Sequence, residues 1–325
     1  MSILKNDNIN WILPILFSKD EYAVAIGNLS NKLQIKNPIK CAYGTIKCKW
    51  SLNYDSFMKF EDLKYIEKVL QTYQNLSITP LINFSQYDIT TKDLDDDFCN
   101  KFLELSIQYN SEFIVASDVL ADYIKNKYPN SIITSSVMYP KLNYQGIDDK
   151  VGECSLYNEL ITKFDKVIIR PEFAKTHLLE TIDKISDISK IQVPINDSCK
   201  MNCQHFKECF NITSSNFVCP KDIDEKFFGI KSKFTNLCII EKDLINNFTK
   251  SKINNFILSS YNVPIAFLET IFNEYMFNTD GDFQKYSQII RYDLNDLISK
   301  NIFHSEFQKS FFSMNFSHKV NLLEI

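Results

Sequence analysis

Eight short apolar runs, separated by longer segments, constrain the fold of this chain more than any other feature. Each run is five to seven residues long and shows little polar alternation, as expected for strands buried on both faces of a parallel sheet. The runs are Ile12–Phe17, Ile39–Gly44, Ile78–Asn83, Phe113–Ser117, Ser131–Ser136, Lys166–Pro171, Ile191–Asn196 and Asn254–Ser260.

The segments between these runs have the periodicity of amphipathic helices. The clearest are Phe60–Tyr73, Asp97–Tyr109, Leu120–Lys127, Leu156–Phe164 and Thr176–Ile188. Ser117 or Asp118 is expected to cap the third of these helices, and Pro129 to end it. Eight strands alternating with helices predict a (β/α)8 barrel of the TIM type. A doubly wound open sheet is the main alternative, but it usually carries a glycine-rich ligand turn, and this chain has none.

Composition excludes several classes of function. Six glycines among 325 residues, with no GxGxxG or GxxxxGK[ST] run, argue against Rossmann and P-loop nucleotide sites. The net charge of -4 argues against a nucleic-acid partner. No stretch approaches the ~18–20 apolar residues that span a bilayer, and the first residues lack the basic segment of a signal peptide. We therefore expect a cytoplasmic protein with no membrane partner.

The character of the sequence changes near residue 262. Residues 1–262 are predicted to form the barrel, including a cysteine-rich loop at about 197–240. Residues 263–325 read as a helical extension that begins at Pro264 and is too short for a second enzyme domain. We expect this extension to contact a protein partner or a second copy of the chain.

Cysteine usage points to a metal. Nine cysteines, an odd number, argue against a disulfide framework. Four of them, Cys199, Cys203, Cys209 and Cys219, cluster in a polar segment, where unoccupied thiols would be open to oxidation. Structural zinc usually uses paired C-x2-C knuckles, which this segment lacks. Irregular spacing suits an iron–sulfur cluster at least as well, so we expect [4Fe–4S], with zinc as the alternative.

Chemistry in such barrels occurs at the carboxyl ends of the strands. The polar residues at those positions, expected to bind substrate, are Tyr43, Asn83, Asp118, Ser135, Ser136, Arg170 and Asn196. Structural alternatives stay open for several of them. Asp118 could act as a helix cap, and Ser135 and Ser136 as turn residues. Arg170 could bind an anionic substrate or pair with Glu172 or Asp118.

A further acidic feature, the run Asp95–Asp97, would suit a divalent ion. The run is interpreted first as a helix N-terminus, where carboxylates oppose the macrodipole. The sequence also shows no G-x-S-x-G, HExxH or Cys–His nucleophile signature, which disfavours a peptidase.

The order of these parts resembles the collagenase-like peptidase family U-32. The stretch Asn236-Leu237-Cys238-Ile239-Ile240, followed by a last strand through Asn255-Phe256-Ile257, is similar to the "LCL" stretch and final strand of that family. Members of the family carry a [4Fe–4S] cluster on four cysteines, which implies Cys238 as a ligand here, together with Cys199. Five cysteines then compete for four positions, with Cys238 replacing Cys203 or Cys209 if the family arrangement holds.

A second resemblance is to uncharacterised barrel proteins related to that family. It rests on Asp97–Asn100, Tyr123-Ile124 with Tyr128-Pro129, Ser135-Ser136 and the segment from Asn196 to Cys203. Iron–sulfur members resemble oxygen-independent hydroxylases, which implies a small-molecule or modified-macromolecule substrate. The final strand lacks the family's Lys, Glu and Arg, so no catalytic residue is carried over. The alternative function is a zinc-stapled, non-catalytic barrel that acts as a binding or assembly subunit.

Overall fold

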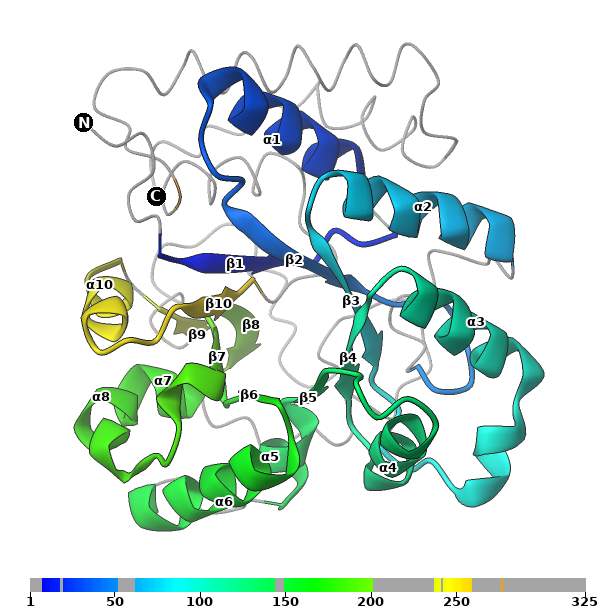
Figure 1. Cartoon of the computed structure of the whole chain (residues 1–325). Helices are drawn as coiled ribbons and strands as arrows, with labels where there is room; N and C mark the ends of the chain where they lie inside the picture. The colour runs from blue at the N-terminus through cyan, green and yellow to red at the C-terminus, as the bar shows by residue number, and fades with distance from the viewer. Residues whose placement is uncertain are drawn as a thin grey trace, which may run out of the picture.

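The computed structural model describes residues 8–17, 20–51, 62–143, 149–200, 237–240, 242–258 and 276. Eight parallel strands close into a barrel in the order β1-β10-β7-β6-β5-β4-β3-β2 (Figure 1). The strands are β1 (Asn10–Leu13), β2 (Ile39–Gly44), β3 (Thr79–Phe84), β4 (Glu112–Val115), β5 (Ile133–Ser135), β6 (Lys166–Ile168), β7 (Ile191–Pro194) and β10 (Asn255–Ile257). The predicted (β/α)8 barrel is confirmed.

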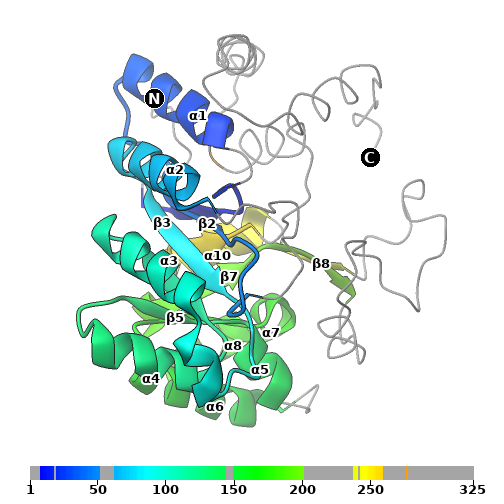
Figure 2. The same cartoon turned by 90° about the vertical axis from the view of Figure 1, so that its right-hand side faces the viewer.

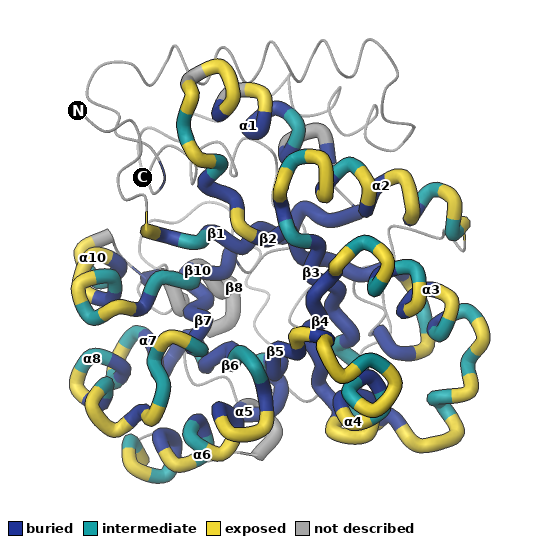
Figure 3. Tube along the Cα trace, viewed as in Figure 1, coloured by how far each residue is buried: buried dark blue, intermediate teal, exposed yellow. Residues whose placement is uncertain are grey.

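Helices surround the strands. They are α1 (Asp20–Leu33), α2 (Leu63–Asn75), α3 (Asp97–Gln108), α4 (Asp118–Lys127), α5 (Met138–Asn143), α6 (Lys150–Lys163), α7 (Pro171–Thr176), α8 (Leu178–Thr181) and α10 (Lys242–Lys250). Short 3-10 turns are η2 (Thr91–Asp95), η3 (Ile182–Lys184) and η4 (Ile188–Lys190). Figure 3 shows buried residues along the strands and exposed residues on the outer faces of the helices. The main core therefore lies between the barrel strands and the surrounding helices.

Aspartate side chains cap the N-termini of helices α2 and α3. Asp62 accepts hydrogen bonds from the backbone N–H groups of Lys64 and Tyr65 at the start of α2. Asp96 accepts one from the N–H of Cys99, over 2.8 Å, at the start of α3. Such caps satisfy donors that have no partner within the helix. The interpretation of the aspartate run as a helix N-terminus is therefore confirmed.

Aromatic side chains fill much of the layer between strands and helices. Phe84 on β3 stacks on Phe113 of β4 with ring centroids 5.9 Å apart, and it meets Phe102 of α3 edge to face at 5.8 Å. All three rings are fully buried. Rings of this size contribute a large share of the apolar area that folding removes from water.

Two expected elements differ from the structure. The first apolar run was expected to be a strand to Phe17, but β1 ends at Leu13 and a turn follows, in which Phe17 has a φ of 64°. Proline at position 14 has no N–H to continue the hydrogen-bond ladder of the strand.

Residues 176–188 were expected to form one helix but contain α8 and η3 instead. There the Thr181 hydroxyl donates to the carbonyl of His177 over 2.9 Å, a local bond that competes with regular helix.

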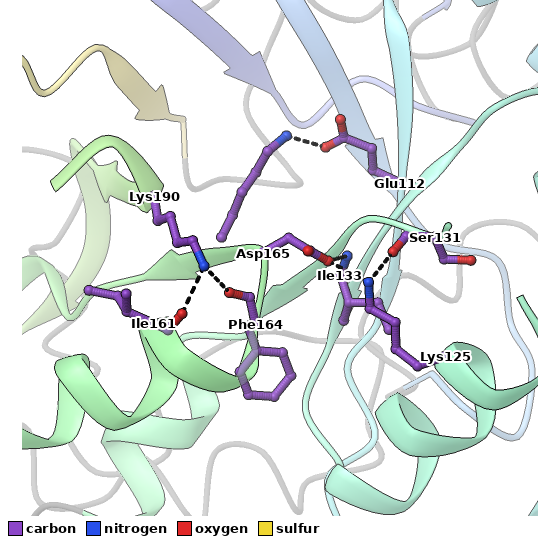
Figure 4. Close-up of polar contacts among 9 residues, drawn as sticks. Glu112, Lys125, Ser131, Ile133, Ile161, Phe164, Asp165 and Lys190 are labelled. Carbon is purple, nitrogen blue, oxygen red and sulfur yellow. Dashed lines mark hydrogen bonds and ion pairs between the residues drawn. The ribbon is translucent and has the colours of Figure 1, made fainter. Parts of the chain in front are cut away.

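Salt bridges and hydrogen bonds hold the amino ends of β5, β6 and β7 to the helices (Figure 4). The carboxylate of Asp165, just before β6, accepts hydrogen bonds from the N–H of Ile133 at 2.8 Å and from Lys125 of α4 at 2.9 Å. Lys190 donates to the carbonyls of Ile161 and Phe164, over 2.8 and 3.1 Å, at the end of α6. A lysine at this position satisfies carbonyls that have no partner within the helix.

The insertion between β7 and β10 holds a second, two-stranded antiparallel sheet of β8 (Asn196–Lys200) and β9 (Leu237–Ile239). Figure 2 shows β8 projecting away from the barrel. The predicted helical extension, residues 263–325, lies outside the described residues except for Met276. Among the helices that the structure describes, each is too short or too polar to cross a bilayer.

Replacing Asp165 with asparagine tests the network at the amino ends. Burial opposes ionisation of Asp165, but the Ile133 N–H and the Lys125 ammonium outweigh it and hold the pKa below its usual 3.8. Its charged form therefore stabilises the fold above that pH, and the contribution is lost as the pH falls through the lower folded-state pKa. We expect D165N to lower the free energy of unfolding at neutral pH by about 1 kcal/mol, discounted for partial exposure.

Urea denaturation at neutral pH and below pH 3.8 would measure this effect. Asp122→Asn on the exposed face of α4 is the control, with an expected change under about 0.5 kcal/mol. An effect of D165N that stays constant across this pH range would contradict the assigned role of the charge.

Candidate functional site

The interior of the barrel has its own small apolar core, distinct from the layer beneath the helices. It comprises Ile12, Cys41, Tyr43, Leu81, Ile114, Ile168 and Ile257, one or two from each contributing strand. Because side chains alternate along a strand and keep their face across a parallel pair, the register identifies further interior residues. Thr134 pairs with Ile114, and Gln192 pairs with Ile168, so both of these polar side chains also face the interior.

The amino half of the interior is charged. Lys166 pairs in register with Thr134 and therefore faces inward, where its ammonium contacts the carboxylate of Glu112 at 2.5 Å. Burial, followed by the charge of Glu112, raises the pKa of the neighbouring Cys41 thiol to about 12. This thiol therefore stays protonated at neutral pH.

The carboxyl half of the interior is apolar. Tyr43, Ile114, Ile168 and Ile257 lie at the later interior positions of their strands, and all four are buried. The hydroxyl of Tyr43 donates to the carbonyl of Leu258 over 2.5 Å, which joins β2 to the residue that follows β10. These side chains form a floor below the mouth of the barrel, as layered side chains do in this fold.

Two of the predicted substrate residues face the interior at the mouth. Asn83 lies near the end of β3 and pairs in register with Ile114. Ser136 directly follows β5 and comes two positions after the inward-facing Thr134, so alternation turns it to the same side. Its side chain accepts a hydrogen bond from the N–H of Met138 at 3.3 Å. Asn83 and Ser136 are 8% and 5% exposed, so each has little contact with solvent.

Two other predicted residues are directed to the helix layer. Ser135 pairs in register with Val115 and Val167, both members of the outer core, and it is fully buried. Asp118 is the first residue of α4, and its carboxylate contacts Lys163 of α6 at 2.8 Å. Ser117 takes the N-cap position without a capping side-chain hydrogen bond.

Arg170 binds Glu153, a partner that sequence reasoning did not consider. The guanidinium makes two hydrogen bonds of 2.7 Å to the two carboxylate oxygens. Tyr157 donates to the same carboxylate over 2.6 Å and accepts from the N–H of Arg170 at 3.0 Å. Burial and the charge of Glu153 hold the pKa of Tyr157 well above its usual range. This network joins the end of β6 to α6, in place of the expected pairing of Arg170 with Glu172 or Asp118.

Glu172 is a further acidic residue at this edge that the set of predicted substrate residues omits. It lies in the first turn of α7, directly after β6, and α7 packs against β9. The side chain is buried at 8% exposure, and its Oε2 has no hydrogen-bond partner among the described residues. A buried carboxylate oxygen usually has a partner, so this atom has unused capacity to accept a hydrogen bond. The sequence feature that could have identified Glu172 is the Arg-Pro-Glu run, because it directly follows a predicted strand.

The β8–β9 sheet brings two predicted metal ligands onto neighbouring strands. Asp197 pairs with Cys238, and Lys200 with Leu237, with a bulge between them that contains Cys199. The sheet is anchored to the barrel because Ile195, after β7, donates to Ile257 and accepts from the N–H of Ile240. Asn196 begins β8 opposite Ile239.

The remaining predicted ligands, Cys203, Cys209 and Cys219, lie outside the described residues. Within the described part of the chain, no three His, Cys, Asp or Glu side chains gather in a way that could hold a metal ion.

Comparisons with known proteins give limited matches. No protein-family model matches the chain, and no curated protein does. Among solved structures, the chain is similar to a structure described as that of a U32 peptidase, with a TM-score of 0.45 and 9% sequence identity. The match covers 79% of this chain and 94% of that one. The fold assigned here rests on the strand pairing of this chain itself.

The Arg170–Glu153 pair should contribute strongly to stability. The side chains of Arg170 and Glu153 are only 12% and 2% exposed, so removing the carboxylate deprives a buried guanidinium of both hydrogen bonds to Glu153. We expect Glu153→Ala to lower the free energy of unfolding by about 3–5 kcal/mol. The matched control is Glu180→Ala, which breaks the exposed pair with Lys150 and should cost less than about 1 kcal/mol. Equal losses in denaturant titrations of the two variants would refute the structural role of the pair.

Proposed function

We propose that this chain is a metal-binding barrel enzyme whose late cysteines hold an iron–sulfur cluster beside the mouth. The substrate, a small molecule or a modified macromolecule, would bind at the carboxyl ends of the strands. The observation that carries the proposal is the antiparallel pairing of β8 and β9, which sets the backbones of Cys199 and Cys238 on neighbouring strands directly after β7.

The donor chemistry fits such a cluster. Lys200 pairs with Leu237, so the two ends of the segment that contains Cys203, Cys209 and Cys219 lie next to each other. A segment whose two ends are paired can supply several thiolates to one centre without regular spacing. Cysteine thiolates are the usual ligands of [4Fe–4S] clusters, and the five cysteines Cys199, Cys203, Cys209, Cys219 and Cys238 exceed the four positions required.

The residues at the mouth would bind and orient the substrate. Asn83 and Ser136 offer polar groups on the inward face, and the apolar floor that includes Tyr43 excludes water from below. The Oε2 atom of Glu172, which has no partner among the described residues, can accept a hydrogen bond from a bound molecule. The cluster, when bound, supplies electron transfer. The reaction class implied by the resemblance to the U-32 family is oxygen-independent hydroxylation or a related modification.

A zinc-stapled barrel that serves as a binding or assembly subunit is the second candidate. The observation that favours it is the double hydrogen bond between Arg170 and Glu153, because this pairing gives the arginine at the mouth a structural role. In that case the metal would order the loop after β8 and take no part in chemistry.

Anaerobic purification followed by an absorption spectrum and analysis of iron, sulfide and zinc separates the candidates. A broad band near ~400 nm with about four irons per chain is the expected result. About one zinc per chain without colour would select the structural alternative. Protein never exposed to air that contains neither metal would overturn both.

Single substitutions test the ligands. We expect Cys199→Ser and Cys238→Ser to reduce the amount of bound metal, because each substitution removes one of the proposed thiolate ligands on β8 and β9. Cys154→Ala is the matched control, since Cys154 is a free, buried cysteine on α6 that behaves as a small apolar side chain. Metal content per chain, measured by elemental analysis of each purified variant, is the readout. If Cys154→Ala and Cys199→Ser retain equal metal, the assigned ligand set is wrong.

A further inference from the structure

Thr134 and Gln192 are polar residues in the packed middle of the barrel interior. Both side chains face inward, and the two residues are only 0% and 1% exposed. The Oγ1 atom of Thr134 and the Oε1 atom of Gln192 have no hydrogen-bond partner among the described residues. Buried polar atoms in proteins almost always have a partner, and an ordered water often provides it. These two atoms therefore need a partner that the surrounding side chains do not supply.

The strand register places Thr134 and Gln192 at the same level of the barrel. On its two neighbouring strands, Thr134 pairs with Ile114 of the apolar floor and with Lys166, which lies nearer the amino ends. Four inward-facing residues share this arrangement, each between one floor residue and one lower residue. They are Ile12 between Ile257 and Cys41, Leu81 between Tyr43 and Glu112, Thr134 between Ile114 and Lys166, and Gln192 between Ile168 and Asn255. They form one layer of four side chains from alternate strands, as is usual in this fold.

The two polar members of this layer are neighbours around the barrel. Thr134 belongs to β5 and Gln192 to β7, and β6 is the strand between them. The other two members, Ile12 and Leu81, make the rest of the layer apolar. The two unpartnered oxygen atoms are therefore on the same side of a layer that is otherwise hydrophobic.

The chemistry of the two atoms favours water as the ligand. The side-chain carbonyl of glutamine only accepts hydrogen bonds, whereas the hydroxyl of threonine can donate and accept. A water molecule donates two hydrogen bonds and accepts two, so it can satisfy both groups at once. A metal ion is disfavoured because both groups are uncharged and the ammonium of Lys166 projects into the interior from the strand between them.

We propose that the barrel interior contains a water-binding site between Thr134 and Gln192. The bound water donates a hydrogen bond to the Gln192 carbonyl and shares a second one with the Thr134 hydroxyl. The apolar floor separates this site from the mouth, so the site does not depend on the proposed metal or substrate. The water exchanges with solvent through the amino end, where the side chains of Lys166 and Glu112 are 27% and 11% exposed.

A high-resolution crystal structure of the full-length protein tests this proposal. We expect electron density for one ordered water within about 3.2 Å of both the Thr134 hydroxyl and the Gln192 amide group. A direct hydrogen bond between Thr134 and Gln192, or an interior without water at this level, would overturn the proposal.

A double-mutant cycle tests the bridge in solution. Thr134→Val removes the hydroxyl and Gln192→Met removes the amide, while each keeps a side chain of similar size. We expect each single substitution to lower the urea midpoint of unfolding, because the remaining polar group and the water lose a partner. The double substitution should lower the midpoint by less than the sum of the two single effects, since neither polar group is then left to need the water.

Thr162→Val on the exposed face of α6 is the control, and it should shift the midpoint less than Thr134→Val does. Single substitutions that raise the midpoint would mean that the two atoms have no partner in the native protein, which refutes the site. Additive losses would equally refute a water shared by both side chains. The crystal structure of the unsubstituted protein keeps the proposal testable even if a variant folds poorly.

Discussion

The pairing of the first strand with the last one determines how the rest of this molecule is arranged. β1 and β10 align from Asn10 opposite Asn255 to Ile12 opposite Ile257, and the N–H of Leu258 donates to the carbonyl of Ile12 at 3.0 Å. A parallel sheet left open would expose unpaired backbone groups at both edges. Closure removes these edges and gathers all eight strand ends at one mouth. Because β7 ends there and β10 starts at the opposite face, the insertion between them must begin at the mouth.

The interior side chains limit which groups a molecule at the mouth of the barrel can contact. The charged pair of Glu112 and Lys166 occupies the amino half, and an apolar layer that includes Tyr43 closes the barrel above it. A molecule bound as proposed would therefore contact groups at the rim, among them the buried polar side chains of Asn83, Ser136 and Glu172. This rim is shared with the paired strands of the cysteine segment, which supports the proposed location of a substrate beside the metal.

The four cysteines whose side chains the structure describes lie in different environments. Cys41 lies in the barrel interior, where burial raises its pKa to about 12, and Cys154 is buried on α6 and belongs to no group of three potential metal ligands among the described residues. The Cys48 sulfur lies 3.1 Å from the hydroxyl of Ser51 in the segment after β2. Thiol chemistry follows thiolate character and access, so buried cysteines of this kind would stay inert beside the late cysteines that are proposed to bind metal.

The sequence by itself determined the eight barrel strands, the helices α2, α3, α4 and α6, and the acidic start of α3, because apolar runs, helical periodicity and capping residues are local signals. Only the tertiary structure decided that Ser136 faces inward while Ser135 faces the helices, since strands buried on both faces carry no alternation to mark a side. It likewise joined Arg170 to Glu153, and the backbone of Cys238 to that of Asp197. Those partners are far apart in the chain, and strand register and helix packing, which no local pattern encodes, bring them together.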